Sequence, residues 1–367
     1  MNWKDKMKIV VYDTAAEDGG GLFVLKKFYE DALAIKNRHI KWFFLVSNDA
    51  IKTHENVIVK KYEIVKKSYI HRVIFEKIYL RKILKKINPD LVISLQNMPI
   101  KGCKVKQYTY LHQSLQYCPK KFSLLKSEER DLAFRQKVIC NIYKKNLTKS
   151  DHIFVQTNWI KKATEKWLNV GDEKITVVPV TMQMNSAIEG KYEGQTARIF
   201  FYPARAEMYK NHMVVVEACK RLVSEGIKDF NVIFTIKKDD GDYAKRIINE
   251  SRGLPIDFIG TVPYEKIWEY YKTTILLFPS YLETCGLPML EAKAVGARIL
   301  ASDMPFSHEN LDEYENVGFF NYKNPKELAE KMKEMIESPT YTTPPKEEKV
   351  KLKSLTEIML ERVQLHG

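Results

Sequence analysis

The chain has 367 residues, of which 45% are apolar and 29% are charged, and its formal net charge is +14. This length exceeds what one ordinary hydrophobic core organises, so two domains of about 150–200 residues each are expected. The composition is typical of a folded globular protein and argues against a disordered chain. No stretch of the sequence reaches the roughly 18 consecutive apolar residues that a membrane-spanning helix needs.

The charge is distributed unevenly along the chain. Residues 1–190 hold 35 Lys and Arg against 19 Asp and Glu, whereas residues 191–367 hold 25 against 27. This asymmetry favours an anionic partner for the first half: nucleic acid, an anionic membrane surface or an acidic substrate. The first residues, MNWKDKMKIVVYD, lack the long apolar segment and the cleavage site of a signal peptide. We therefore expect a cytoplasmic protein, and we expect its five scattered cysteines to be reduced thiols.

Apolar strands and amphipathic helices alternate in the first half. The expected strands are 7–13, 41–47, 57–62, 90–96, 107–113, 152–157 and 175–180. The expected helical segments are 19–36, 68–87, about 125–147 and 158–168. Continuous apolar strands that alternate with helices predict a parallel sheet covered on both faces.

The same alternation starts again at residue 197. The expected strands are 197–204, 230–236, 256–262, 275–280, 297–303 and 317–322, and the expected helices are 211–226, 241–251, 264–274, 288–296 and 325–338. The polar stretch 183–196 between the two series suits a linker. The sequence therefore predicts an α/β fold with two Rossmann-like doubly wound domains, 1–182 and 197–345. A last helix within 346–367 follows, for which we consider packing against the first domain.

Two cations follow the first strand of the second domain. Ligands of doubly wound sheets bind outside the carboxyl ends of the strands, so residues just after strands are the natural candidates. Arg205 and Lys210 occupy such positions, and a guanidinium and an ammonium both suit phosphate oxygens. The pair would be equally ordinary as two solvated loop cations.

Two glutamates flank the Gly-Leu-Pro turn that follows the strand 275–280. Pro288 is expected at the helix start, which puts Glu291 in the first helical turn and Glu283 in the loop before it. A helix start offers unpaired N–H groups to an anion, and a carboxylate accepts hydrogen bonds from neighbouring hydroxyls. The arrangement fits a ligand with two sugars joined by phosphates, such as a nucleotide sugar. A glutamate that only complements the helix dipole, worth at most about 1 kcal/mol, would explain Glu291 but not Glu283.

Three weaker candidates come from other loops. Gly20 and Gly21 follow the first strand and would let the backbone approach a phosphate or a sugar, although no dinucleotide or Walker pattern is present. His112 ends the strand 107–113, where it would contact a transferred sugar or serve a structural role. The Asp240-Gly241-Asp242 sequence is typical of a polar turn, and we do not expect it to bind a metal.

Together these segments resemble the retaining, nucleotide-sugar-dependent glycosyltransferases of GT-B architecture that carry a Glu-x(7)-Glu motif, a family that includes many bacterial cell-surface polysaccharide enzymes. The segment ETCGLPMLEAKAVGARILASD is similar to the family's E-x-x-G-x-P-x-x-E-A core, and ARAEMYKNH to its Arg and Lys five residues apart. The glycine run, His112 and the segment HIFVQTNWIKKATEKW also match its pattern. The resemblance covers nearly the whole chain and is strongest over 197–310.

The resemblance implies a hexosyl- or related glycosyltransferase of EC class 2.4 that moves a sugar, with retention, from a nucleoside-diphosphate sugar to a glycan or a polyprenyl-diphosphate-linked acceptor. The pathway implied is O-antigen, capsule or similar polysaccharide biosynthesis. Arg205 and Lys210 would bind the diphosphate, Glu291 the ribose, and Glu283 the donor sugar. The remaining residues implied for donor binding are Gly20, Gly21, Thr261, Val262, Thr284, Cys285, Gly286, Leu287 and Pro288, with His112 as a further catalytic residue. No cofactor and no essential metal is implied.

The basic residues concentrate in and just before the predicted helix 68–87. Residues 60–86 hold ten Lys and Arg against two Glu. Its apolar residues are Ile70, Val73, Ile74, Ile78, Leu84 and Ile87. Such a helix can lie on an anionic membrane surface, at the inner face of the cell membrane, or it can be a core helix with a lysine-rich wet face.

Two other function classes stay open from the residues alone. A sugar-nucleotide epimerase also has two Rossmann-like halves. A basic nucleic-acid-binding protein would explain the charge, but we find no recognition helix, zinc finger or RNA-binding aromatic motif, so we expect no nucleic-acid partner.

Overall fold

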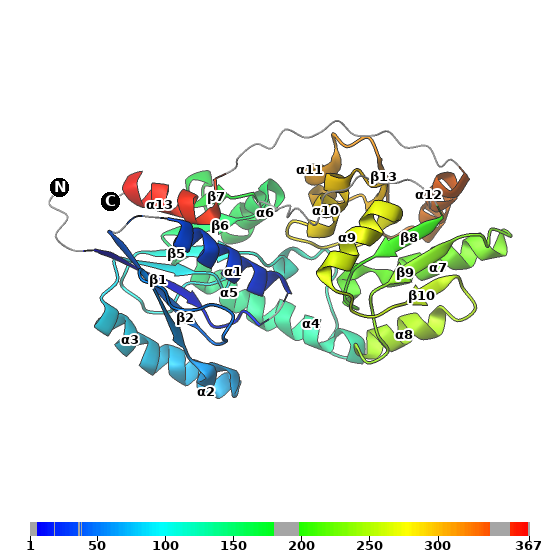
Figure 1. Cartoon of the computed structure of the whole chain (residues 1–367). Helices are drawn as coiled ribbons and strands as arrows, with labels where there is room; N and C mark the ends of the chain where they lie inside the picture. The colour runs from blue at the N-terminus through cyan, green and yellow to red at the C-terminus, as the bar shows by residue number, and fades with distance from the viewer. Residues whose placement is uncertain are drawn as a thin grey trace. The chain divides into compact units, whose positions relative to one another are not determined.

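The computed structural model describes residues 6–17, 19–35, 37, 39–179, 198–337 and 353–365. The chain divides into two compact units (Figure 1). The first unit comprises Met1–Gln113, Val138–Thr181 and Val350–Gly367, and the second comprises Ser114–Lys137 and Met182–Lys349. The expected linker 183–196 lies outside the described residues, so the expected domain limits stay a prediction.

A seven-stranded parallel sheet forms the centre of the first unit, in the order β3-β2-β1-β4-β5-β6-β7. Its strands are β1 (Met7–Asp13), β2 (Ile40–Val46), β3 (Val57–Lys61), β4 (Leu91–Ser94), β5 (Gln107–Leu111), β6 (His152–Val155) and β7 (Ile175–Val177). The central strands are buried on both faces, as their continuous apolar sequences predict. The strand order reverses between β1 and β4, and the carboxyl ends at such a switch point are where these sheets bind ligands.

The helices of the first unit cover both faces of this sheet. They are α1 (Gly19–Ala34), η1 (Glu63–Lys66), α2 (Tyr69–Ile74), η2 (Phe75–Tyr79), α3 (Leu80–Ile87), α5 (Cys140–Leu147), α6 (Asn158–Leu168) and α13 (Leu355–Leu365). A shorter turn of this unit is η6 (Asp172–Lys174), whereas η3 (Leu115–Tyr117) belongs to the second unit and η5 (Arg135–Ile139) is divided between the two units at Val138. The last helix, α13, packs against α1 (Figure 1). Its Met359 is fully buried in the hydrophobic core beside that helix.

The helix expected at 68–87 differs from its prediction. Its middle part, η2, is π-helical, and a π turn takes more residues than an α turn, which shifts the phase of the side chains that follow. The side chains that face the core are Phe75, Leu80, Leu84 and Ile87, whereas Ile70, Ile74, Ile78 and Tyr79 are exposed. The single apolar face read from the sequence is therefore two faces, one buried and one open to solvent.

A six-stranded parallel sheet forms the centre of the second unit, in the order β10-β9-β8-β11-β12-β13. Its strands are β8 (Ile199–Tyr202), β9 (Asn231–Phe234), β10 (Ile256–Phe258), β11 (Ile275–Phe278), β12 (Ile299–Ser302) and β13 (Val317–Phe320). Its helices are η4 (Ser127–Glu129), α4 (Arg130–Phe134), η8 (Met208–Lys210), α7 (His212–Ser224), α8 (Asp242–Glu250), α9 (Tyr264–Thr273), α10 (Leu287–Val295), α11 (Pro305–Leu311) and α12 (Pro325–Glu337). The order reverses between β8 and β11.

The predicted fold class is confirmed, because both sheets are parallel, doubly wound and covered by helices. Several expected strands are shorter in the structure, and two expected extents have a clear physical reason for the difference or are interrupted. The strand expected at 256–262 ends at Phe258, since Gly260 takes a left-handed conformation with φ of 70° and turns the chain. The helical stretch expected near 125–147 is divided into η4, α4, η5 and α5, with η5 again π-helical.

Candidate active site

The loops after β8 and β11 meet at the switch point of the second sheet. The buried hydroxyl of Tyr202 donates to the carbonyl of Lys210 at 2.9 Å and accepts a hydrogen bond from Ser280 Oγ at 2.9 Å. The backbone N–H of Tyr281 donates to the carbonyl of Tyr209 at 3.0 Å. These bonds hold the two loops against each other, although Tyr202 and Ser280 are 78 residues apart in the sequence.

Asn211 fixes the first of these loops to the sheet. It has a left-handed backbone, with φ of 61°, which asparagine tolerates better than most residues. Its side-chain amide donates to the carbonyl of Pro279 at 3.2 Å and to that of Tyr322 at 2.8 Å. The turn that carries Lys210 is therefore tied to the ends of β11 and β13.

The structure brings two of the predicted site residues into direct contact. The ammonium of Lys210 lies 2.6 Å from Oε1 of Glu283, and the two side chains are only 19% and 13% exposed. A charge-assisted hydrogen bond of this length is among the stronger kinds in proteins. Arg205 is exposed in the same loop, where its carbonyl accepts from the backbone N–H of Glu207 at 2.8 Å. Both predicted cations thus stand at the carboxyl edge of the sheet.

The start of α10 corrects one expectation. Gly286 takes a left-handed conformation with φ of 73°, and the helix begins directly after it, at Leu287. Pro288 is therefore the second helical residue, and Glu291 lies in the second turn rather than in the expected first turn. Because the effect of the helix dipole falls off within the first turn, it does not explain this glutamate.

Glu291 is buried and held by two tyrosines of α9. It is 7% exposed, and its Oε1 accepts from the hydroxyl of Tyr264 at 2.8 Å while Oε2 accepts from that of Tyr271 at 2.9 Å. Burial raises the pKa of this carboxyl, and the two tyrosine hydrogen bonds act in the opposite direction. A carboxylate has about four acceptor positions, so two remain for hydroxyls of a ligand.

The sequence reading missed both tyrosines. Tyr264 and Tyr271 are seven residues apart, a spacing that puts them on the same face of the helix expected at 264–274. The seven-residue spacing could have indicated a shared helix face, but it does not indicate that the two hydroxyls bind Glu291. Only the packing of α9 against α10 brings these hydroxyls to Glu291.

The other predicted donor-binding residues lie around these groups. Cys285 is buried, and burial raises the pKa of its thiol to about 12, so it contributes a neutral side chain. Its carbonyl accepts from the side-chain amide of Asn310 at 2.5 Å, which fixes the turn before α10. Thr284, Leu287 and Pro288 are half-buried in the same turn. Thr261 and Val262 lie in the loop between β10 and α9.

The remaining predicted residues belong to the first unit. Gly20 and Gly21 form the first turn of α1, and a Cβ atom added to Gly21 would lie 3.9 Å from Cε1 of His112. Nε2 of His112 lies 2.8 Å from the carbonyl of Leu95. Because a carbonyl only accepts, Nε2 carries the proton and Nδ1 is the acceptor of the neutral ring. Burial lowers the pKa of His112, which favours that neutral form.

The Asp240-Gly241-Asp242 segment was expected to be a turn; Asp240 lies in the loop after β9, but Asp242 is the first residue of α8. Oδ2 of Asp240 accepts from the backbone N–H of Lys237 at 2.7 Å, and Asp242 pairs with Lys245 at 3.2 Å. In the part of the chain that the structure describes, no three His, Cys, Asp or Glu side chains are grouped as metal ligands. None of the described helices is both long and apolar enough to cross a bilayer.

A sequence comparison with known protein families matches the second half of the chain. Residues 185–353 match the family described as "Glycosyl transferases group 1". The O-antigen chain mannosyltransferase RfbU of Salmonella typhimurium is 24% identical over 185 residues, which are 49% of this chain and 50% of that protein. The chain thus spans about half the length of this curated relative.

Solved structures match the whole fold at low sequence identity. A sucrose-phosphate synthase from Thermosynechococcus elongatus has a TM-score of 0.70 at 15% identity, over 91% of this chain and 90% of that one. A glycosyltransferase from Rickettsia africae gives 0.63 at 16% identity, over 90% and 88% of the two chains. The lipopolysaccharide outer core galactosyltransferase WaaB gives 0.61 at 16%, over 90% of each.

The sequence match and the structural match agree on one assignment. The matched segment contains every predicted residue of the second unit, from Arg205 to Glu291. The fold matches those of solved glycosyltransferase structures. Residues 185–353 thus match the group 1 glycosyltransferases, and the chain has the GT-B fold.

Proposed function

We propose that this protein transfers a sugar, with retention, from a nucleoside-diphosphate sugar to a glycan or a lipid-linked glycan. The observation that carries the proposal is the pair of Lys210 and Glu283 at the carboxyl edge of the second sheet, with Glu291 on the helix that follows. A cation for the diphosphate, a carboxylate for sugar hydroxyls and a second carboxylate for a ribose diol are the groups that such a donor requires.

Each side chain has a distinct role in this proposal. Arg205 and Lys210 stabilise the negative charge that grows on the leaving diphosphate. An ammonium has three N–H donors, so Lys210 can bind phosphate oxygens while one donor serves Glu283. The start of α10 contributes less than the sequence suggests, because Pro288 has no N–H and the N–H of Met289 donates to the carbonyl of Gly286. The anion-binding groups are thus chiefly side chains.

The similar proteins indicate which donors to test first. RfbU is a mannosyltransferase for the O-antigen chain, and the Anabaena Alr3699/HepE structure, 14% identical with a TM-score of 0.59, contains UDP and glucose. UDP-glucose and a nucleotide-linked mannose are therefore the first donors. The acceptor proposed is a cell-surface polysaccharide precursor, such as a polyprenyl-diphosphate-linked glycan, and no metal is required.

Two experiments test this function, first nucleotide binding and then sugar transfer. A nucleoside diphosphate that binds the folded state raises the melting temperature by mass action, which identifies the base. With the matching sugar donor and a lipid-linked acceptor, we expect transfer that persists in EDTA. Lys210→Ala and Glu291→Ala should each lose most of it, whereas Lys220→Ala, in a surface ion pair of the same unit, should retain it.

Two results would contradict the assignment. One is wild-type turnover in both site variants. The other is a melting temperature that no nucleoside diphosphate changes. Donor incubated without acceptor should be recovered with its sugar unchanged, because an epimerised sugar would indicate an isomerase instead.

We also propose that the first unit lies on an anionic membrane surface through α2, η2 and α3. The exposed face carries Ile70, Ile74 and Ile78, at spacings of four residues and with exposures of 68%, 42% and 49%. The exposed cations of the same stretch are Lys77, Arg81, Lys82, Lys85 and Lys86. Apolar side chains between cations are the pattern of helices that lie at an anionic lipid interface.

Vesicle flotation tests this surface. Wild-type protein should float with phosphatidylserine-containing vesicles at low salt, and Ile70→Asp should float much less. Leu33→Asp places the same charge at an exposed apolar position on α1 and should float like the wild type. Equal flotation of both variants, or none by the wild type, would exclude this surface.

A further inference from the structure

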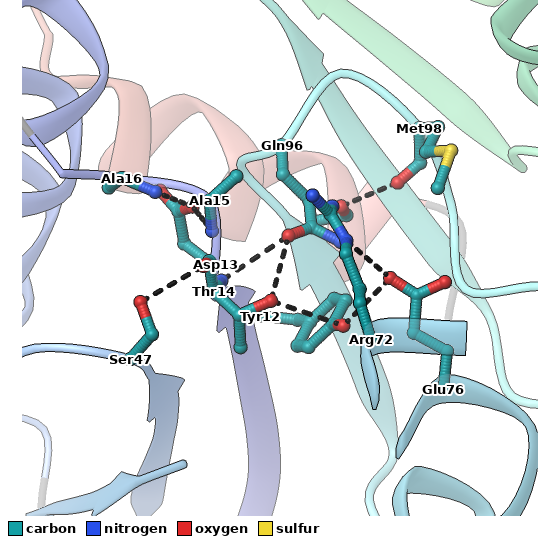
Figure 2. A network of polar contacts seen from close by, with 11 residues as sticks. Tyr12, Asp13, Thr14, Ala15, Ala16, Ser47, Arg72, Glu76, Gln96 and Met98 are labelled. Atoms are coloured by element: carbon teal, nitrogen blue, oxygen red, sulfur yellow. Dashed lines mark hydrogen bonds and ion pairs between the residues drawn. The ribbon is translucent and has the colours of Figure 1, made fainter. Parts of the chain in front are cut away.

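A network of buried polar side chains lies at the carboxyl ends of β1 and β4, the switch point of the first sheet (Figure 2). Thr14 follows β1, and Gln96 follows β4. Oε1 of Gln96 accepts from both the backbone N–H and the hydroxyl of Thr14, each at 3.3 Å. Because a backbone N–H only donates, the oxygen of the Gln96 amide must face Thr14, and its nitrogen must point elsewhere.

The amide nitrogen of Gln96 has no acceptor among the described residues, although Gln96 is only 4% exposed. This nitrogen is not one of the fully buried unpaired atoms of the described residues, so it is open to solvent or to a ligand although most of the residue is buried. A ligand oxygen would satisfy this donor, and the switch point of a parallel sheet is where ligands bind.

Asp13, at the end of β1, presents a complementary group beside it. Its Oδ1 accepts from the backbone N–H groups of Ala15 at 3.2 Å and Ala16 at 3.1 Å (Figure 2). Its second oxygen has no donor within the described part of the chain, and Asp13 is buried. Neighbouring strand ends therefore offer one hydrogen-bond donor and one acceptor. A sugar hydroxyl is both, so two adjacent hydroxyls match this pair.

The surrounding contacts hold Thr14 in place. Its carbonyl accepts from Ser47 Oγ at 2.9 Å, and its hydroxyl lies 3.3 Å from the hydroxyl of Tyr12. That tyrosine donates to Oε1 of Glu76 at 3.3 Å, which also accepts from Nε of Arg72 at 3.1 Å (Figure 2). Thr14 therefore orients the Gln96 amide from a position that is itself fixed.

The residues on either side of Gln96 are fixed as well. The carbonyl of Leu95 accepts from Nε2 of His112, and Oδ1 of Asn97 accepts from the backbone N–H of His112, both at 2.8 Å. Asn97 has a left-handed backbone, with φ of 66°, which is uncommon for a residue other than glycine. The loop after β4 is a rigid support, and it connects Gln96 to the histidine that the sequence reading singled out.

We propose that Gln96 and Asp13 bind two adjacent hydroxyls of the acceptor sugar, with Thr14 as the positioning residue. That this sugar is the acceptor rests on the proposed transferase function, in which the second unit binds the donor. The hydroxyl site itself rests only on residues of the first unit. Its test is therefore independent of nucleotide binding.

Binding of simple glycosides to the full chain tests the site. Saturation-transfer NMR with the methyl glycosides of glucose, galactose, mannose and N-acetylglucosamine, at millimolar concentration with and without UDP, should detect at least one ligand. Gln96→Glu replaces the N–H donor by an oxygen of similar shape, and we expect about a tenfold loss of affinity. Asn37→Asp is the matched control, an exposed amide-to-acid change that keeps the acceptor for His39 N–H.

Thr14 provides a second, graded test. Thr14→Val removes the hydroxyl donor and should weaken glycoside binding, whereas Thr14→Ser keeps it and should restore the affinity. UDP binding should be the same in all these variants. The proposal fails if Gln96→Glu keeps the wild-type glycoside affinity, if it loses UDP and glycoside binding together, or if no glycoside binds the wild type. A failure of UDP binding alone would contradict the transferase assignment and leave the hydroxyl site standing.

Discussion

The pair of Lys210 and Glu283 predicts opposite effects on a nucleotide and on a nucleotide sugar. In the structure the carboxylate of Glu283 holds the ammonium at 2.6 Å. An arriving diphosphate must share that ammonium and lies close to a like charge. Glu283→Gln keeps the shape of the side chain and removes the charge, so it should strengthen the binding of UDP.

The size of this gain follows from how deeply the pair is buried. Exposed ion pairs contribute roughly 0.2–1 kcal/mol. Because the two side chains are only 19% and 13% exposed, solvent screens their attraction less than at the surface. We therefore expect the loss of the Glu283 charge to improve the binding free energy of UDP by about 1–2 kcal/mol. That range corresponds to UDP binding that is about 5- to 30-fold tighter. UDP-glucose should gain less, because the variant also loses the carboxylate that we propose for the donor sugar.

Calorimetric titration of UDP and of UDP-glucose measures both effects. The decisive quantity is the dissociation constant of UDP-glucose divided by that of UDP. This ratio should be larger in the Glu283→Gln variant than in the wild type. Glu250→Gln is the control, since it removes one charge from a 2.7 Å ion pair with Lys220 on the surface of the same unit. Weaker UDP binding in Glu283→Gln, or an unchanged ratio, would refute the reasoning.

Three further predictions concern stability. Tyr271→Phe removes a donor to the buried carboxylate of Glu291 and should cost roughly 1.5–3 kcal/mol in urea unfolding, whereas Tyr270→Phe, whose hydroxyl has no partner among the described residues, should cost little. Burial raises the pKa of Asp13 to about 6, so its stabilising effect is complete below about pH 4 and is lost as the pH rises through 6. The free energy of unfolding of Asp13→Asn minus that of the wild type should therefore increase by up to about 3 kcal/mol from pH 4 to pH 7.5. Denaturant unfolding at several pH values measures this difference, and a difference that does not change with pH would contradict the prediction. Two aspartates raise the pKa of His308, so this histidine stabilises the fold below its ordinary pKa and less as the pH rises; His308→Gln should lower the melting temperature more at pH 5.5 than at pH 8.5, and the opposite order would be inconsistent with these ion pairs.

The fold and the positions of the second-unit candidates could be predicted because their signals are local. Continuous apolar strands between helices indicate parallel sheets, and residues after such strands reach the carboxyl edge. On that basis Arg205, Lys210 and Glu283 were all expected at one edge, and the structure places them there. Whether they bind the donor in the proposed roles stays a prediction.

The pairings between these side chains could not be predicted. Lys210 and Glu283 are 73 residues apart, and nothing in either segment indicates that the two ions touch. The π turn of η2 has no signal in a single sequence, yet it puts the buried Leu80, Leu84 and Ile87 that follow it on a different face from the exposed Ile70 and Ile74 that precede it. Gln96 was also missed, because a polar residue after a strand becomes informative only when one of its two amide atoms is seen to be unpaired.

The two glutamates of the segment ETCGLPMLE differ in environment because Gly286 turns the chain between them. Glu283 stays on the loop and pairs with a cation, whereas Glu291 is turned inward and is held by two neutral tyrosine hydroxyls. Burying a carboxylate normally requires a cation or several hydrogen bonds. Since the tyrosines supply those hydrogen bonds, the site buries a second acid without a further demand on Lys210. A diphosphate therefore competes for the Lys210 ammonium with Glu283 alone and not with Glu291.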